Sequence, residues 1–191
     1  IVKKFKGEYS NNASFEAQIA AVSDDIAYNN NDIDDGLHAK LFEIEELEHI
    51  KIVRENLKKI KTNKFRKTDN RIKHELVRLL IKNMIDDLVA NTHVNLKKHK
   101  PKNCLDVQNI TETLVSFSEE MKSCENELRN FLKLKMYNHQ TVKTMTYKAK
   151  KIISELFDLF VKEHQLLPID WRDFNTQNDL FTNIADYISG L

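Results

Sequence analysis

The chain has 191 residues, enough for one domain with a buried core. Its 30 Lys and Arg against 29 Asp and Glu give a formal net charge of +1, which excludes an overall bias toward nucleic acid or an anionic membrane. Two cysteines without a paired spacing, and no apolar run long enough to span a membrane, predict a reduced, soluble, cytoplasmic protein. Three glycines and two prolines leave few hairpin turns, so we predict an all-α fold.

Both ends of the sequence resemble the ends of a fragment. The first residue is Ile1 rather than Met, and the last apolar residues still follow helical spacing at the C-terminus, namely Ile184, Tyr187, Ile188 and Leu191. We therefore expect residues 1–191 to form one all-helical domain that is a piece of a longer chain.

The predicted elements begin with a helix near residue 15. Its core face is the stripe of Phe15, Ile19, Val22 and Ile26, with Ser14 placed to cap its start. Residues 40–61 then carry apolar side chains at helical spacing and predict one or two amphipathic helices.

Residues 61–70 are polar, basic and without periodicity, which predicts a loop within the domain. Its Lys64, Arg66 and Lys67 either bind phosphate, from a nucleic-acid backbone or an activating nucleotide, or form a solvated loop compensated by nearby acids.

The rest of the chain continues as helices. The most strongly periodic segment, residues 72–88, predicts a helix buried on a wide face and ended before Pro101. Apolar periodicity then resumes over 111–136 and 142–162. Residues 166–171 predict an exposed turn before a last helix, and Cys104 and Cys124 are predicted to be buried spacers.

The stretch 23–37 is unusually rich in aspartate and asparagine. At about 100° per residue, Asp24 lies opposite the first helix's apolar stripe, among small side chains and Tyr28. Such a face indicates close approach by another element or a ligand. If the helix continues, Asp24, Tyr28 and Asp32 share one edge at i, i+4 and i+8.

The aspartates of residues 23–37 are also compatible with a structural role, and they resemble a calcium-binding loop in composition. Asp24 alternatively pairs with an arginine of a neighbouring helix, while the later aspartates cap or solvate a helix end near Gly36. A calcium loop is excluded, because aligning Gly36 as its glycine places Ile33 and Phe42 at ligand positions.

The order of residues resembles the deoxynucleotide triphosphohydrolases of the HD superfamily, the bacterial dGTPase-like proteins. The resemblance rests on Phe15-Glu16-Ala17-Gln18-Ile19-Ala20, Asp24-Asp25-Ile26-Ala27-Tyr28-Asn29, Asp32-Ile33-Asp34-Asp35-Gly36-Leu37, Tyr137-Asn138-His139, Leu166-Leu167-Pro168 with Trp171, and Ala185-Asp186-Tyr187-Ile188. It implies the C-terminal part of an HD-domain-like helical fold.

The resemblance also implies a reaction and a site. In this family, water attacks the α-phosphorus of a dNTP, here preferentially dGTP, at a divalent metal such as Mg or Mn held by two histidines and two aspartates. Asp24 is then the last metal ligand, Tyr28 packs on the deoxyribose and Asp32 binds its 3′-hydroxyl. Weaker nucleotide or phosphate contacts are implied for His139, Asp186 and Tyr187, although His139 is equally suited to cap a helix. A homo-oligomer is also implied.

The departures from the family limit these expectations. Its first metal histidine and its His-Asp pair lie upstream of this segment, and none of the seven histidines here is followed by aspartate. Because a catalytic metal needs about three protein ligands, this chain alone should not hydrolyse dNTPs. The alternatives are an inactive helical module that binds a partner chain, nucleotides or nucleic acid, and a purely structural subunit.

Overall fold

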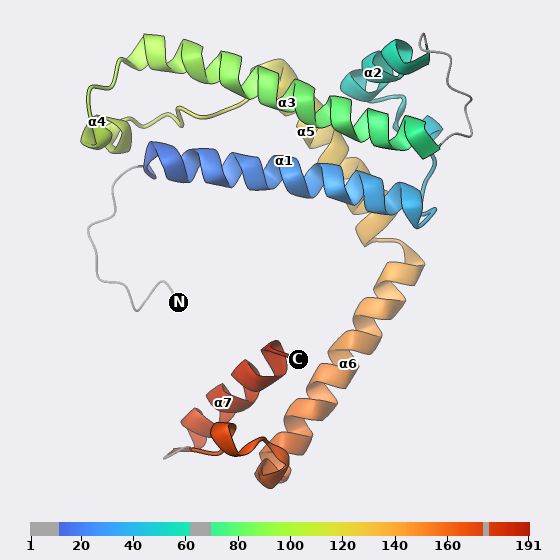
Figure 1. Cartoon of the computed structure of the whole chain (residues 1–191), viewed down its shortest axis with the longest axis vertical. Coiled ribbons are helices and arrows are strands. Elements are labelled where there is room, and N and C mark those ends of the chain that lie inside the picture. The colour runs from blue at the N-terminus through green and yellow to red at the C-terminus, as the bar shows by residue number, and fades with distance from the viewer. Residues whose placement is uncertain (1–11, 62–69, 174–175) are drawn as a thin grey trace. The chain divides into compact units, whose positions relative to one another are not determined.

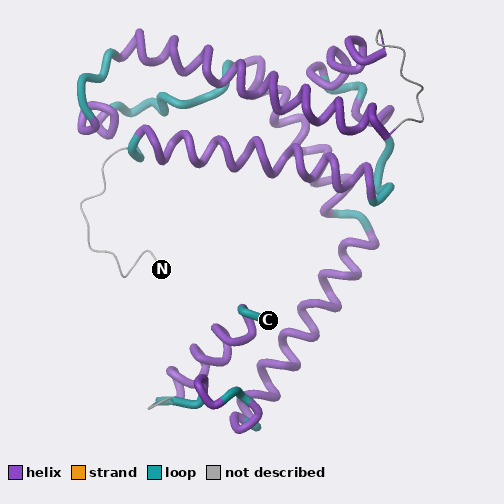
Figure 2. Tube along the Cα trace, in the orientation of Figure 1, coloured by secondary structure: helices purple, strands orange, loops and turns teal. Residues whose placement is uncertain are grey.

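Figure 1 shows the protein as a computed structural model that describes residues 12–61, 70–173 and 176–191. Within these ranges every regular element is a helix and no strand occurs (Figure 2), which confirms the predicted all-α fold. None of the helices in the described ranges combines the length and hydrophobicity needed to cross a bilayer. Lys64, Arg66 and Lys67 of the predicted basic loop lie outside the described residues.

The helices divide into two compact units, residues 1–137 and 138–191. The predicted one-domain organisation stays a prediction. In chain order the elements are α1 (Phe15–His38), η2 (Ile44–Leu47), α2 (Lys51–Lys61), α3 (Asn70–His99), α4 (Cys104–Asn109), α5 (Glu119–Leu132), η3 (Lys133–Tyr137), α6 (Gln140–Lys162), η4 (His164–Leu166), η5 (Ile169–Trp171) and α7 (Gln177–Ser189).

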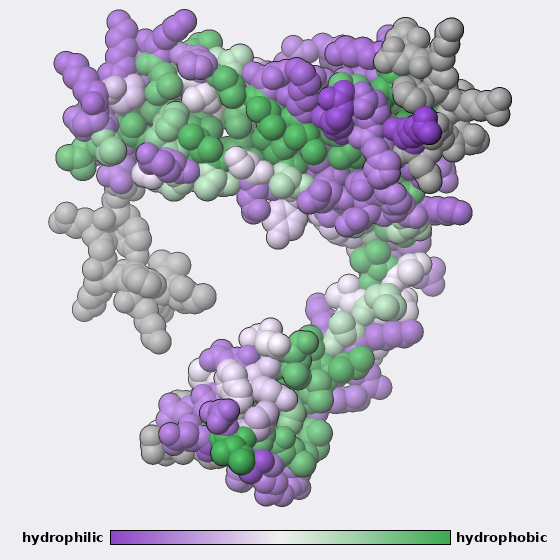
Figure 3. Space-filling view, viewed as in Figure 1, coloured by the Kyte–Doolittle hydropathy of each residue, from purple (hydrophilic) through white to green (hydrophobic). Residues whose placement is uncertain are grey.

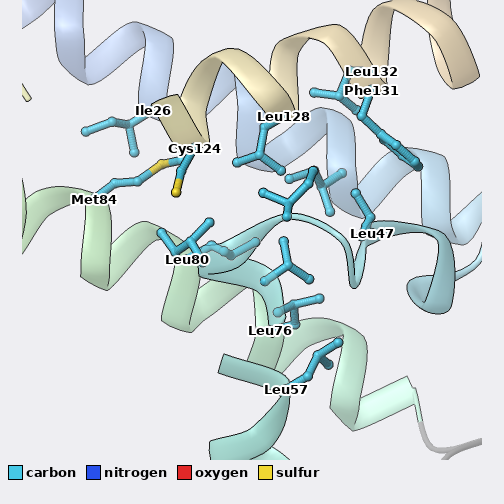
Figure 4. Close-up of a cluster of buried hydrophobic side chains, with 14 of the residues drawn as sticks. Ile26, Leu47, Leu57, Leu76, Leu80, Met84, Cys124, Leu128, Phe131 and Leu132 are labelled. Atoms are coloured by element: carbon cyan, nitrogen blue, oxygen red, sulfur yellow. The ribbon is translucent and has the colours of Figure 1, made fainter. Parts of the chain in front are cut away.

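The core of the first unit lies where α1, α2, α3 and α5 meet (Figure 4). Leu76, Leu80 and Met84 of α3 are fully buried, and they meet Leu128 from α5 and other apolar side chains from α1 and α2. Burial of each such side chain contributes about 1.5–3 kcal/mol, so this cluster fixes the position of α1.

The extended segment between α4 and α5 is held by amide side chains. Asn95 donates to the Leu114 carbonyl at 2.9 Å and Asn91 to the Ser116 carbonyl at 2.8 Å. Ser118, which caps α5, donates its hydroxyl to Asp87 at 2.6 Å. The sequence predicted apolar helical periodicity from residue 111, but these hydrogen bonds keep residues 111–118 out of a helix.

Gln18 joins the start of α1 to the same segment. Its side chain is only 5% exposed, and its Oε1 accepts hydrogen bonds from the Leu114 and Val115 amides at 3.0 and 3.1 Å. Its Nε2 donates to the Ala13 carbonyl at 2.9 Å. One buried side chain therefore satisfies two buried backbone donors.

The buried face of α1 differs from the predicted stripe. Ser14 caps the helix as predicted, accepting from the Ala17 amide at 3.3 Å, but Ile19 is 42% exposed and Phe15 and Val22 are only half-buried. The observed buried set is Gln18, Ile26, Asn29, Asn30, Ile33, Gly36 and Leu37. The predicted stripe is confirmed in part, because Ile26 is buried and Phe15 and Val22 pack against the core. Ile19 is exposed, and hydrogen-bonded amides share the packed face with the apolar side chains.

Gly36 permits a close approach at the end of α1. A Cβ at this position would lie 2.2 Å from the ring of Phe42, which is 2% exposed and packs edge-on against Phe131. The chain can therefore turn back tightly after α1 only because this residue has no side chain.

The second unit packs α6, η4, η5 and α7 around Phe160, Leu167, Leu180 and Ile184. Trp171 docks η5 onto this cluster, with its ring centre 5.8 Å from that of Tyr187. Leu167 is fully buried, so the predicted exposed turn at residues 166–171 contributes to the core. Cys124 is buried as predicted, whereas Cys104 is exposed, contrary to the prediction.

Candidate functional site

Asp24, Tyr28 and Asp32 lie on successive turns of one continuous helix, α1. Asp24 is exposed, Tyr28 is 64% exposed and Asp32 is half-buried. Ala17, Ala20 and Ala21 on the same face are also exposed. We predicted from the sequence that another element or a ligand approaches this face of α1 closely. No described residue covers the face.

An ion pair forms beside Asp24 rather than with it. Arg129 of α5 contacts Asp25 at 3.0 Å and Glu125 at 2.6 Å, which ties α1 to α5. Among the described residues Asp24 forms no ion pair. The arginine ion pair that was the alternative prediction for Asp24 is therefore formed by Asp25 instead.

Asp32 is held by a residue distant in sequence. The Tyr137 hydroxyl donates a hydrogen bond to Asp32 Oδ2 from η3, a π-helical turn that follows α5. This hydrogen bond, together with burial, raises the pKa of Tyr137 to about 12. Sequence analysis assigned Tyr137 no role, although the motif Tyr137-Asn138-His139 was part of the resemblance and was the signal available.

The raised pKa of Tyr137 gives a testable expectation. Its phenol should titrate near pH 12 rather than near 10, because ionisation removes the donor and places a second negative charge beside Asp32. The folded-state pKa lies above the unfolded one, so the stability from this bond is present below pH 10 and is lost as pH rises toward 12. Phenolate absorbance of the wild type minus that of Tyr137→Phe isolates this titration.

Asp32→Asn is the control for this titration. It should move the Tyr137 titration toward the ordinary range, since an amide neither carries charge nor accepts as strongly as a carboxylate. A Tyr137 titration near pH 10 in the wild type, unchanged in Asp32→Asn, would contradict the contact.

A second cluster lies farther along α1. Asp34 Oδ1 is 3.4 Å from His38 Nδ1 and 3.8 Å from His74 Nδ1, and the two imidazole rings lie 5.3 Å apart. The sequence placed these histidines 36 residues apart and gave no sign that they meet. Packing of α1 against α3 brings them together.

The described residues do not form a complete metal site. They contain no group of three His, Cys, Asp or Glu side chains arranged to hold a metal ion. Asp24 offers a single exposed carboxylate, whereas a catalytic metal needs about three protein ligands. The described residues by themselves therefore do not fit a divalent metal.

The remaining predicted site residues belong to the second unit. His139 caps α6, its Nδ1 accepting from the Thr141 amide at 3.3 Å, which matches one of its two interpretations. Asp186 is exposed on α7. Tyr187 is half-buried against Phe160 and Trp171, with ring centres 5.5 and 5.8 Å away.

Neither of two hollows among the described residues of the first unit includes the Asp24 edge. One of about 260 Å³ is lined by Lys51, Glu120 and Cys124 among others. The other, of about 510 Å³, is lined by His49, Phe131 and Leu134 among others. With Asp24 and Tyr28 exposed and Asp32 half-buried, the edge formed by these three residues is an open surface.

The sequence is similar to known proteins over most of its length. Residues 115–191 match the model of the phosphohydrolase-associated domain. Over 182 residues, 94% of this chain, the sequence is 35% identical to the deoxyguanosinetriphosphate triphosphohydrolase-like protein of Bartonella henselae and 37% identical to that of Bartonella quintana. The chain is therefore similar to the dGTPase-like proteins, as its residues predicted. The protein of the same name from Brucella suis is 36% identical over 96% of the chain.

The chain spans about half the length of the curated relatives it matches, 46% in each of these three. The similarity covers all but the ends of the chain, so both the α1 edge and Tyr137 lie inside it. The phosphohydrolase-associated match begins just before α5 and contains Tyr137, while α1 precedes it. The Tyr137–Asp32 hydrogen bond therefore joins two separate parts of the dGTPase-like sequence.

Proposed function

We propose that this chain forms one side of the active site of a dNTP triphosphohydrolase, which is completed in a longer protein. The observation that carries the proposal is the open edge of Asp24, Tyr28 and Asp32 on one helix of a dGTPase-like chain. The proposed reaction adds water to a dNTP, with dGTP favoured, and releases a deoxynucleoside and intact triphosphate. The relatives' printed names support a guanine deoxynucleotide as substrate.

Each side chain on the edge has a proposed role. Residues i, i+4 and i+8 rise roughly 12 Å along a helix, so side chains on this edge can contact a metal ion beside the phosphates, the sugar ring and the sugar hydroxyl of one nucleotide. Asp24 is proposed to bind a divalent metal beside the phosphates. Tyr28, a residue that is 64% exposed, presents a flat apolar surface to the sugar.

Asp32 is proposed to accept a hydrogen bond from the 3′-hydroxyl of the sugar. A carboxylate accepts hydrogen bonds at both oxygens, and Tyr137 uses only Oδ2. Oδ1 remains to receive the substrate hydroxyl. In this proposal Tyr137 is a positioning residue, because it fixes the orientation of the carboxylate that contacts the sugar.

The metal, proposed as Mg, Mn or another divalent ion, requires further ligands. When bound it would neutralise phosphate charge and acidify water. Asp24 alone cannot hold it, so we propose the activity only for the longer protein, which we also propose to be a homo-oligomer. The cytoplasmic location stays a prediction from the sequence.

Product analysis tests the proposed function. The longer native protein, incubated with dGTP and a divalent metal, should release deoxyguanosine and triphosphate in equal amounts, and a chelator should stop the release. Release of dGMP and pyrophosphate would contradict attack on the α-phosphorus with departure of the deoxynucleoside.

A second candidate function is a helical module that binds a partner chain without catalysis. The exposed alanines of α1, Ala17, Ala20 and Ala21, favour it because small side chains allow another helix to approach closely. In that case the native protein would release no nucleoside from dGTP, and it would co-purify with a partner chain in fixed stoichiometry.

A further inference from the structure

The apolar residues of α6 form a heptad seam. They recur with alternating spacings of three and four residues, the pattern of a two-stranded coiled coil. The seam residues are Val142, Met145, Ala149, Ile152, Leu156 and Leu159. They cover residues 142–159, or roughly 27 Å of helix at 1.5 Å per residue.

Most of this seam is exposed. Every residue from 143 to 155 is exposed, with Met145 at 61% and Ile152 at 56%, and apolar surface is visible along α6 in Figure 3. The core of the second unit uses a neighbouring side of the helix, where Phe160 is buried and Phe157 packs near α7. Of the seam residues only Leu156, which is half-buried, also packs against that core, so the rest of the seam is not needed to build it.

We propose that the seam pairs with α6 of a second copy of this chain as an antiparallel two-helix coiled coil. A two-fold axis between residues 150 and 151 gives three matched layers. Val142 then faces Leu159 of the second copy, Met145 faces Leu156, and the small Ala149 faces the larger Ile152. Each layer occurs twice, so both seams are covered from end to end.

Charges beside the seam select this orientation. Lys148 and Glu155 both occupy the position just before a seam residue, on the same flank of the helix. In an antiparallel pair these flanks face each other, which places Lys148 beside Glu155 of the second copy twice. Glu155 also lies 3.7 Å from Lys151 of its own helix, where both side chains are exposed.

A parallel pair would lack this match. It would place Lys148 beside Ile153 of the second copy, and Glu155 beside Phe160. No opposite charges would meet across the seam. The inference concerns assembly and does not depend on the proposed hydrolase activity.

Sedimentation of the 191-residue chain tests the pairing. The wild type should be dimeric at tens of micromolar. Lys148→Glu and Glu155→Lys should each weaken the dimer about tenfold or more, because two attractive pairs become repulsive. The double variant Lys148→Glu/Glu155→Lys should recover most of the affinity, since opposite charges then face each other again.

Other results would overturn the proposal. A wild type that sediments as a monomer would show that the seam does not pair with a second copy. Two single variants that weaken the dimer without recovery in the double variant would remove the charge match. Helical circular dichroism of all four proteins checks that each is folded.

Cysteine cross-linking tests the orientation. In a Cys104→Ser background, which removes the exposed thiol, Ala149→Cys and Ile152→Cys chains are oxidised separately and as a mixture. An antiparallel pair should give disulfide-linked dimers mainly in the mixture, because residue 149 faces residue 152. Efficient dimers from Ala149→Cys alone would show a parallel pair and overturn the proposal.

Discussion

Asp24→Ala in the longer native protein should reduce dNTP turnover roughly a thousandfold or more, because a metal ligand removed from the reacting phosphates costs at least as much as one strong charge-stabilising contact. Its thermal midpoint should stay near that of the wild type. Asp24 is exposed and pairs with none of the described cations, so its loss removes no folded-state contact. Steady-state kinetics with dGTP and thermal unfolding of the same preparation measure both quantities.

Asp25→Ala is the matched control for this variant. The adjacent carboxylate forms the ion pair with Arg129, and pairs of such exposure contribute about 0–1 kcal/mol. This variant should therefore keep its turnover while losing a little stability. Equal turnover in Asp24→Ala and the wild type would sink the assignment of Asp24.

Gln18→Leu should lower the free energy of unfolding by about 2–5 kcal/mol, because it strands two buried backbone amides at roughly 1–3 kcal/mol each. Leu114 and Val115 donate to the lost Oε1, and leucine fills a similar volume without an acceptor. A loss of this size is a large fraction of the stability of a typical domain. Urea unfolding followed by circular dichroism measures it.

The neighbouring residue supplies a control for Gln18→Leu. Ile19 lies one position later on the same turn and is 42% exposed, so Ile19→Gln should change stability by about 0.5 kcal/mol or less. If Gln18→Leu is as stable as Ile19→Gln, the Gln18 side chain does not hold the segment before α5.

Local patterns predicted most of the helices because their caps and breakers are local. Ser14 and Pro101 mark a helix start and a helix end that the structure retains. The short α4 was missed, since six residues give too little periodicity to detect. The buried amides of α1 were also missed, because whether an amide such as Gln18 is buried depends on partners 96 residues away.

Only part of the candidate site could be predicted from the sequence, for the same reason. The edge of Asp24, Tyr28 and Asp32 follows from helical spacing within one element, and the structure keeps that helix continuous. The contact between Tyr137 and Asp32 spans 105 residues and depends on the packing of α1 against α5. Spacing within one helix cannot reveal a contact that only tertiary packing creates.

We propose that Asp24 is one of the ligands of a divalent metal ion in the longer protein. The metal content of the purified protein tests this role most directly. The purified native protein, its Asp24→Ala variant and its Asp25→Ala variant are dialysed against the same divalent metal and analysed by mass spectrometry for bound metal per chain. We predict that the wild type and Asp25→Ala retain the metal and that Asp24→Ala loses most of it. Equal metal content in all three proteins would contradict the role proposed for Asp24.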